Sequence, residues 1–136
     1  MTGNFEIKSV KENQFWLVGP NKTILKEGNI IHVIISGLQD YNMAHSQFKL
    51  HQQITGLVND KVSYLVDLND SGKSTPEARR IWKDISGRDD TFKVAFFGSH
   101  PVAKVLADFI IDIAKNNNMR FFEQEGEAVR WLKGKI

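Results

Sequence analysis

The N-terminal third of the chain shows a spacing of apolar and polar residues that is typical of short β-strands. Apolar and polar residues alternate over residues 5–10, and an apolar run covers residues 15–18 after a polar cluster suited to a turn. Two further strands are predicted over residues 23–26 and 30–37. The second of these is almost continuously apolar and rich in β-branched residues, which favours a strand covered on both faces.

Further along the chain the pattern changes to helices that alternate with strands. Met43 and Leu50 fall on one arc of an amphipathic helix predicted over residues 42–58. Thr75 followed by Pro76 predicts the start of another helix, with Thr75 as its N-cap. The remaining predicted elements are strands over 62–68, 93–97 and 119–122, a helix that opens at residues 98–101 and runs to about residue 116, and a closing helix over 125–133.

This order of elements predicts one α/β domain over residues 1–136. Strands that alternate with helices pair in parallel through right-handed crossovers, whereas the closely spaced leading strands pair antiparallel. The expected architecture is a mixed, mostly parallel sheet with helices packed on it and antiparallel strands at its N-terminal edge.

Length, charge and amino-acid composition exclude several classes of function. A length of 136 residues suits one domain, and 18 basic against 16 acidic residues leave a net charge of +2, too small to predict binding to nucleic acid. The absence of cysteine excludes disulfides, thiolate metal sites and cysteine nucleophiles. The first residues show no apolar segment of the signal-peptide type, and no apolar run is long enough to span a bilayer. We therefore predict a cytoplasmic protein without a membrane span.

The second half carries four short motifs in the order of the predicted βα units. They are Val66-Asp67-Leu68, Ala95-x-x-Gly98-Ser99-x-Pro101-x-Ala103, Phe121-Phe122 and Glu127-Ala128-x-x-Trp131-Leu132. With the β-rich start, they resemble the STAS domain family over essentially the whole chain, specifically its bacterial SpoIIAA-like group, which is related to sporulation anti-anti-sigma factors. The resemblance implies a fold shared with STAS regulators and CRAL-TRIO-type lipid-binding domains. It also implies a small, non-catalytic and often dimeric protein.

The same resemblance implies a phosphorylation site. STAS phosphoregulators place an Asp-Ser pair at the start of the helix that follows the Asp67-type strand, where a phosphate meets the helix N-terminus. Here Asp70-Ser71 has the matching residues but lies only three residues beyond Asp67, whereas the matching position is Thr75. The candidate sites are therefore Ser71, Ser74 and Thr75.

Motifs of known enzyme and metal sites are incomplete in this chain. Gly72-Lys73-Ser74-Thr75 is similar to the end of a phosphate-binding P-loop, but Asp67 stands where that motif requires glycine. No GxSxG nucleophile motif and no HxxxH or HExxH metal motif occurs. We therefore predict no enzyme activity, no cofactor and no metal site, with catalysis by Asp67, Ser99 or His100 as an alternative. His100 itself is interpreted as part of a helix-start loop in which Ser99 is the N-cap.

Polar residues gather after two of the predicted parallel strands, and ligands of open α/β sheets bind beyond the carboxyl ends of such strands. The predicted interaction surface consists of Asp67, Asn69, Asp70, Ser71, Lys73, Ser74, Thr75, Ser99 and His100. The first functional hypothesis is a non-catalytic regulatory module. It would bind a partner protein through the polar loop over residues 67–75 and the helix that follows.

A second hypothesis concerns the helix over residues 42–58. Gln47 and His51 fall within its apolar arc, and polar groups that face a core need partners. One interpretation is that they bond backbone carbonyls at the edge of the sheet. The other is that, with Phe48, they line a cavity that carries a lipid or another apolar small molecule, as the CRAL-TRIO likeness implies.

The helix after Pro101 has an unusually wide apolar arc. Such breadth indicates burial on more than one side. Core packing explains it on one interpretation, and a homodimer contact on the other.

Overall fold

The computed structural model describes residues 7–10, 15–114 and 117–136 and forms one seven-stranded sheet with four helices in these ranges. The strands are β1 (Ile7–Val10), β2 (Phe15–Val18), β3 (Asn21–Lys26), β4 (Ile30–Gln39), β5 (Val62–Ser74), β6 (Thr91–Phe97) and β7 (Met119–Phe122). The helices are α1 (Tyr41–Val58), α2 (Pro76–Ser86), α3 (Pro101–Ala114) and α4 (Glu125–Leu132). Residues 5 and 6 of the first predicted strand lie outside the described ranges. None of the described helices is long and apolar enough to cross a membrane.

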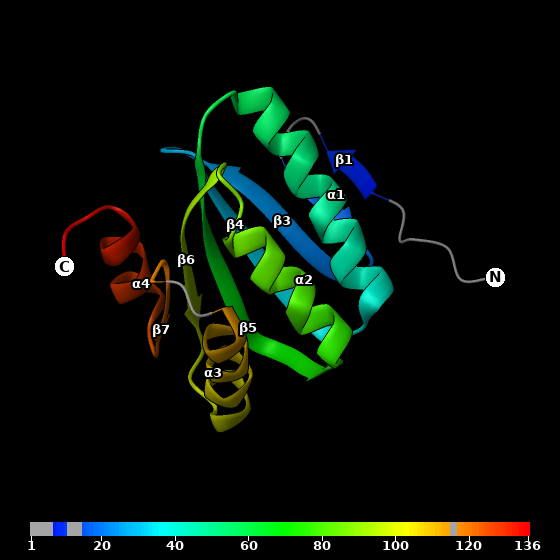
Figure 1. Ribbon diagram of the computed structural model, residues 1–136, viewed down its shortest axis with the longest axis vertical. Helices are drawn as coiled ribbons and strands as arrows, with labels where there is room; N and C mark the ends of the chain where they lie inside the picture. Colours follow the sequence, from blue (N-terminus) through cyan, green and yellow to red (C-terminus); the bar gives the residue numbers. More distant parts are fainter. Residues whose placement is uncertain (1–6, 11–14, 115–116) are drawn as a thin grey trace.

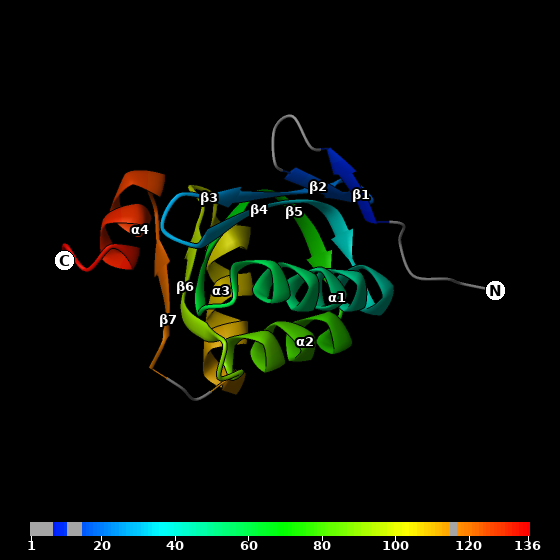
Figure 2. The same ribbon diagram turned by 90° about the horizontal axis from the view of Figure 1, so that it is seen from above.

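The strands lie in the sheet in the order of the sequence, from β1 to β7 (Figure 1). The pairs from β1 to β4 are antiparallel, and those from β4 to β7 are parallel. Because each helical crossover advances by one strand with the same hand, α1, α2 and α3 lie in a row on one face of the sheet (Figure 2). The predicted mixed, mostly parallel α/β fold with antiparallel N-terminal strands is confirmed.

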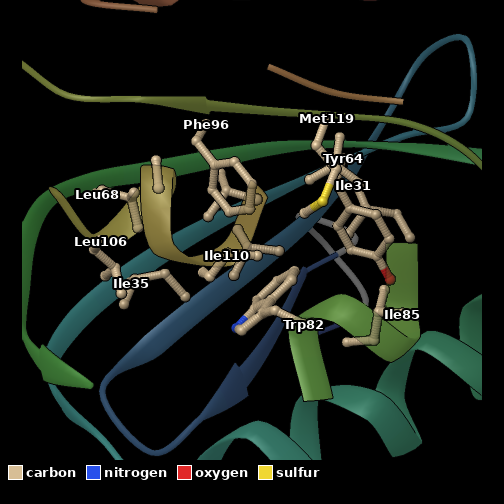
Figure 3. Packing of buried hydrophobic residues seen from close by; sticks show 14 of the residues in the cluster. Ile31, Ile35, Tyr64, Leu68, Trp82, Ile85, Phe96, Leu106, Ile110 and Met119 are labelled. Carbon is tan, nitrogen blue, oxygen red and sulfur yellow. The ribbon is translucent and has the colours of Figure 1, made fainter. Parts of the chain in front are cut away.

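The main core lies between the sheet and these three helices. Trp82 of α2 is its centre, because its ring meets Tyr64 at 5.7 Å and Phe96 at 6.4 Å, both in edge-on geometry (Figure 3). Leu106 and Ile110 of α3 pack beside Phe96. Complete burial of each such side chain is worth about 1.5–3 kcal/mol, so α2 and α3 are held to the sheet by the core-facing positions of their apolar arcs.

A second, smaller core lies on the opposite face of the sheet, under α4. Alternate residues of the strands point to this face, so Ala95, Phe97 and Phe122 meet Ala128 and Leu132 of α4. Strands β5 and β6 are therefore covered on both faces, as their continuous apolar patterns require.

The main difference from the prediction concerns the segment after Leu68. The predicted loop over residues 67–75 is wrong, because β5 continues to Ser74 alongside a β4 that extends to Gln39. A β-carbon added at Gly72 would lie 2.9 Å from the carbonyl carbon of Gly37, so the two backbones approach too closely for a side chain there. The glycine that resembled part of a P-loop thus permits strand pairing.

Candidate functional site

The carboxyl ends of β5 and β6 meet at one edge of the sheet and bring two polar segments together. The side-chain oxygen of Asn69 accepts hydrogen bonds from the Ser99 backbone N–H at 3.0 Å and from the Ser99 hydroxyl at 3.3 Å. Its amide nitrogen donates to Asp67 at 3.0 Å. Asn69 therefore ties the end of β5 to the segment that leads into α3, although thirty residues separate it from Ser99 in the sequence. We call the nine predicted residues at this edge the carboxyl-end surface.

His100 also belongs to this junction, and its hydrogen bonds determine which ring nitrogen carries the proton. Its Nε2 lies 3.1 Å from the carbonyl oxygen of Leu68, and because a carbonyl only accepts, Nε2 carries the proton. Its Nδ1 accepts from the backbone N–H of Ala103 at 3.3 Å. His100 therefore provides the side-chain cap of α3, and the prediction that Ser99 caps this helix is wrong, because the Ser99 hydroxyl points to Asn69 instead.

The extended part of β5 presents a polar tip next to this junction. Asp70 and Lys73 are exposed, whereas Ser71 is buried and its hydroxyl donates to the carbonyl of Gly72 at 3.2 Å. Thr75 caps α2 as predicted, since its hydroxyl oxygen accepts from the backbone N–H of Ala78 at 3.2 Å. The carbonyl of Ser74 accepts from Arg79 at 2.6 Å. The exposed atoms of this tip are thus mainly the carboxylate of Asp70 and the ammonium of Lys73.

The carboxyl ends of the parallel strands carry an excess of acidic residues. A shallow pocket of ≈ 260 Å³ beside His100 is lined by Gly98, Ser99, His100, Pro101, Lys104, Phe121 and Glu123. Acidic residues near this edge are Asp40 after β4, Asp67 and Asp70 within β5, Glu123 after β7 and Glu125 at the start of α4. Basic residues near the same edge are fewer, namely Lys73 of β5, Arg79 of α2 and Lys104 of α3. This distribution favours a partner surface of positive charge.

A second polar cluster lies at the opposite, amino ends of the parallel strands. His51 of α1 is buried, with Nδ1 bonded to the hydroxyl of Tyr64 and Nε2 2.8 Å from Asp90. Arg88 binds Asp90 through two hydrogen bonds of 3.0 and 3.1 Å. The carboxylate of Asp90 needs a donor, so neutral His51 donates from Nε2 and accepts the Tyr64 proton at Nδ1.

The ionisation of this cluster follows from its environment. Burial lowers the pKa of His51 and raises that of Tyr64 well above its ordinary value. Burial tends to raise the pKa of Asp90, but hydrogen bonds from Arg88 and His51 outweigh it and lower that pKa to about 2. The cluster thus holds an anionic Asp90 between Arg88 and a neutral His51. The sequence singled out His51 by its place on an apolar arc, but contained no signal for Asp90.

Gln47, Phe48 and His51 each contact neighbouring elements of the described structure. The side-chain nitrogen of Gln47 donates to Thr23 at 3.3 Å, and its oxygen accepts from Asn21 at 3.5 Å. Phe48 packs against the main core. Gln47 and His51 therefore bond mainly side chains of neighbouring elements, rather than the backbone carbonyls that one interpretation expected.

In the described ranges, no group of three or more His, Asp or Glu side chains is placed to hold a metal ion. The polar atoms of the carboxyl-end junction bond one another. These bonds fix the positions of the polar side chains at the carboxyl ends of β5 and β6.

Comparison with known proteins places this architecture in a family. Residues 24–135 match the family model "Domain of unknown function (DUF7793)", and the chain belongs to this family. No protein among curated sequences matches it significantly.

Two solved structures share the fold. An uncharacterized protein of the DUF3478 family from Shewanella loihica PV-4, with a SpoIIAA-like fold, superposes with a TM-score of 0.60 at 11% identity and covers 97% of this chain and 96% of its own. The anti-sigma factor antagonist SpoIIAA in its unphosphorylated form superposes with a TM-score of 0.53 at 10% identity, over 84% of this chain and 98% of its own. The fold is therefore STAS/SpoIIAA-like, as the sequence resemblance implied.

Proposed function

We propose that this DUF7793 member, folded as one domain over residues 1–136, is a non-catalytic regulatory module of the cytoplasm that binds a partner protein through its carboxyl-end surface. One observation carries the proposal. Asn69 locks two polar segments, which are distant in the sequence, into one fixed edge with Asp70 and Lys73 exposed beside it. A preformed polar edge lowers the entropic cost of binding a macromolecule. The fold likeness to an anti-sigma factor antagonist supports a regulatory role.

The hydrogen bonds of this edge support a non-catalytic role. A general base needs a free lone pair close to the group that it deprotonates. Nδ1 of His100 accepts from the backbone of α3, while Nε2 holds the proton that is donated to Leu68. The Ser99 hydroxyl lies against the oxygen of Asn69 and not against a basic nitrogen. These contacts favour a structural use of both side chains over the alternative of catalysis.

The proposal is tested by capture from a native lysate with immobilised wild-type protein, Asp70→Lys and Asp60→Lys. Asp60 is an exposed aspartate between α1 and β5, at the amino ends of the strands, so it controls for the same change of charge away from the proposed surface. We expect Asp70→Lys to lose proteins that wild type and Asp60→Lys both retain, because a lysine at the tip repels a positively charged partner. Equal recovery by all three would contradict this surface.

Phosphorylation of Ser71, Ser74 or Thr75 stays a separate prediction about regulation of the same surface. Burial of Ser71 disfavours access by a kinase, whereas Thr75 stands at the N-terminus of α2, where a phosphate is electrostatically favourable. Mass spectrometry of the chain from its native cell locates the phosphate. We expect the phosphate on Thr75, and a phosphate on the buried Ser71 would contradict this expectation.

The carrier hypothesis needs a cavity in the interior of the protein. One hollow in the described chain, between the sheet, Trp82 and Ile110, has ≈ 10 Å³ of space, enough for one water molecule at most. A lipid bound at this hollow would have to open the core. Native mass spectrometry of freshly purified protein separates the hypotheses, because a carrier retains an apolar ligand and the proposed module gives the mass of the bare chain.

A further inference from the structure

A pocket of ≈ 520 Å³ lies at the amino ends of the strands, on the side of the sheet that α4 covers. It is bordered by the turn between β3 and β4, the first residues of β5 and β6, and the end of α4. The turn and α4 lie side by side (Figures 1 and 2). Ligand pockets in proteins have volumes of about 300–1,000 Å³, so this one has room for a small organic molecule. We call it the amino-end pocket, and its lining includes Ile30, Lys61, Ser63, Phe92, Leu132 and Lys133.

The inner wall of the amino-end pocket is apolar apart from one hydroxyl group. Ile30 and Leu132 line the pocket and also belong to the core under α4. Ser63 stands between Val62 and Tyr64, which face the main core, so the Ser63 side chain faces the α4 side of the sheet. Ser63 is only 7% exposed, and its hydroxyl makes no hydrogen bond within the described part of the chain. Because buried polar groups are normally hydrogen-bonded, this hydroxyl is suited to bind a ligand.

Two lysines give the entrance of the pocket a positive charge. Lys61 precedes β5 and Lys133 follows α4, and both side chains are exposed. Neither lysine forms an ion pair with another residue that the structure describes. The carboxylate of Asp60 also lines the pocket, where it accepts a hydrogen bond from the backbone N–H of Lys61 at 2.7 Å. The lining thus carries two positive charges against one negative charge, which favours an anionic ligand.

An exposed aromatic ring stands beside these charges. Phe92 of β6 lines the pocket and is 54% exposed, although it lies within a strand. The ammonium of Lys93 lies 5.3 Å from the centre of its ring. Aromatic rings attract one another in stacked or edge-on arrangements, with centroids about 4.5–7 Å apart. A planar ligand ring would therefore cover Phe92 and remove its apolar surface from water.

We propose that the amino-end pocket binds a small aromatic anion, that is, a planar ring that carries a carboxylate or a phosphate. The ring packs on Phe92 and Leu132. The anionic group accepts a hydrogen bond from the Ser63 hydroxyl and is attracted by Lys61 and Lys133. This site lies at the opposite ends of the strands from the carboxyl-end surface, so the inference does not depend on the proposed function.

Nuclear magnetic resonance titration of the full chain tests the proposal with four probes, each up to about 10 mM. Benzoate and phenyl phosphate are aromatic anions, benzyl alcohol has the ring without the charge, and inorganic phosphate has the charge without the ring. We expect at least one aromatic anion to shift the amide signals of Ser63, Phe92 and Leu132 to saturation. The other two probes should bind about tenfold more weakly, because each lacks one of the two contacts. The tighter of the two aromatic anions identifies the preferred anionic group.

Substitutions test the role of each polar side chain in this site. Ser63→Ala should weaken binding about tenfold, because it removes a hydrogen bond to a charged group. Lys61→Gln and Lys133→Gln should each weaken it about threefold, as expected for exposed charges. Lys49→Gln changes an exposed lysine of α1 and should bind like wild type. Thermal unfolding shows whether Ser63→Ala is folded, and the two exposed lysines test the site independently of it.

Several outcomes would overturn the proposal. One is the absence of a saturable shift at these three amides with either aromatic anion. Another is equally tight binding of benzyl alcohol or inorganic phosphate, which would show that the ring and the charge are not recognised together. Wild-type affinity in a folded Ser63→Ala variant and in both lysine variants of the pocket would also contradict the site.

Discussion

At the scale of single residues, buried polar side chains fix the relative positions of elements that pack together through the apolar core. His51 links α1 to Tyr64 of β5 and to Asp90 ahead of β6. A buried hydrogen bond contributes about 1 kcal/mol, and an unsatisfied buried partner costs about 1–3 kcal/mol. The sequence identified His51 as unusual, but the partners of a side chain depend on tertiary packing.

Replacing His51 with phenylalanine tests this role. The change keeps a ring of similar shape but leaves the buried Tyr64 hydroxyl without its partner, so we expect the free energy of unfolding to fall by about 1–3 kcal/mol. Urea denaturation at neutral pH measures it. The His51→Phe variant should regain stability when Tyr64→Phe is added, and a second loss of similar size would contradict the proposed bond.

The same residue predicts a pH dependence of stability. Because burial lowers the pKa of His51 in the folded protein, the unfolded chain takes up the proton first as the pH falls through the ordinary histidine pKa of 6.5. The contribution of neutral His51 to the free energy of unfolding is therefore complete above pH 6.5. It declines as the pH falls towards the lowered pKa that His51 has in the folded protein. Burial also lowers the pKa of His32, which acts in the same direction.

Urea denaturation at pH 7.5 and 5.5 isolates the contribution of His51. We expect the wild type to lose more stability than His51→Gln over this interval, because glutamine takes up no proton and His32 is present in both proteins. An equal loss in the two proteins would show that His51 does not titrate differently on folding.

Gly72 gives a prediction about backbone contact. Gly72→Ala places a β-carbon 2.9 Å from a backbone carbon of Gly37, and forcing the strands apart should cost about 1–3 kcal/mol. Gly56→Ala is the matched control, since its β-carbon meets nothing within 4 Å and alanine favours a helix interior by about 0.5–1 kcal/mol. Thermal unfolding of both variants should therefore shift in opposite directions; a shift in the same direction would contradict this contact.

At the scale of elements, periodicity predicted the existence and order of helices and strands better than their ends. The prediction ended this strand at residue 68, where the apolar run ends. Strand β5 continues for six further residues, because β4 supplies backbone hydrogen-bond partners there. Pairing between distant strands leaves no local signal in polar residues such as Asp70. Thr75 and Pro76, by contrast, marked the start of α2 correctly, because capping acts within one turn.

The junction between β5 and α3 makes a prediction at this scale. Asn69→Ala removes the acceptor of the Ser99 N–H, so we expect the Ser99 amide to exchange with solvent about tenfold faster. Amide exchange followed by nuclear magnetic resonance measures this, with the buried Ala95 amide of β6 as the internal reference. Unchanged exchange at Ser99 would contradict the proposed tie.

At the scale of the whole molecule, the fold separates two poles. One pole holds the carboxyl-end surface, and the other holds the closed cluster of His51, Tyr64, Arg88 and Asp90. The sequence predicted the first pole, because strand ends and helix starts place polar residues there in any parallel sheet. The sequence did not predict the second pole. It also did not predict that half of the apolar arc of α3 is exposed, since exposure depends on where the neighbouring helices end.

Hydrogen-exchange mass spectrometry of the chain, alone and bound to the protein lost by Asp70→Lys in the capture experiment, tests the central proposal most directly. Binding at the carboxyl-end surface predicts slower exchange in peptides that cover residues 67–75 and 98–104. Peptides that cover residues 52–61 and 87–90 at the opposite pole should be unchanged. Slower exchange confined to those opposite-pole peptides would contradict the account.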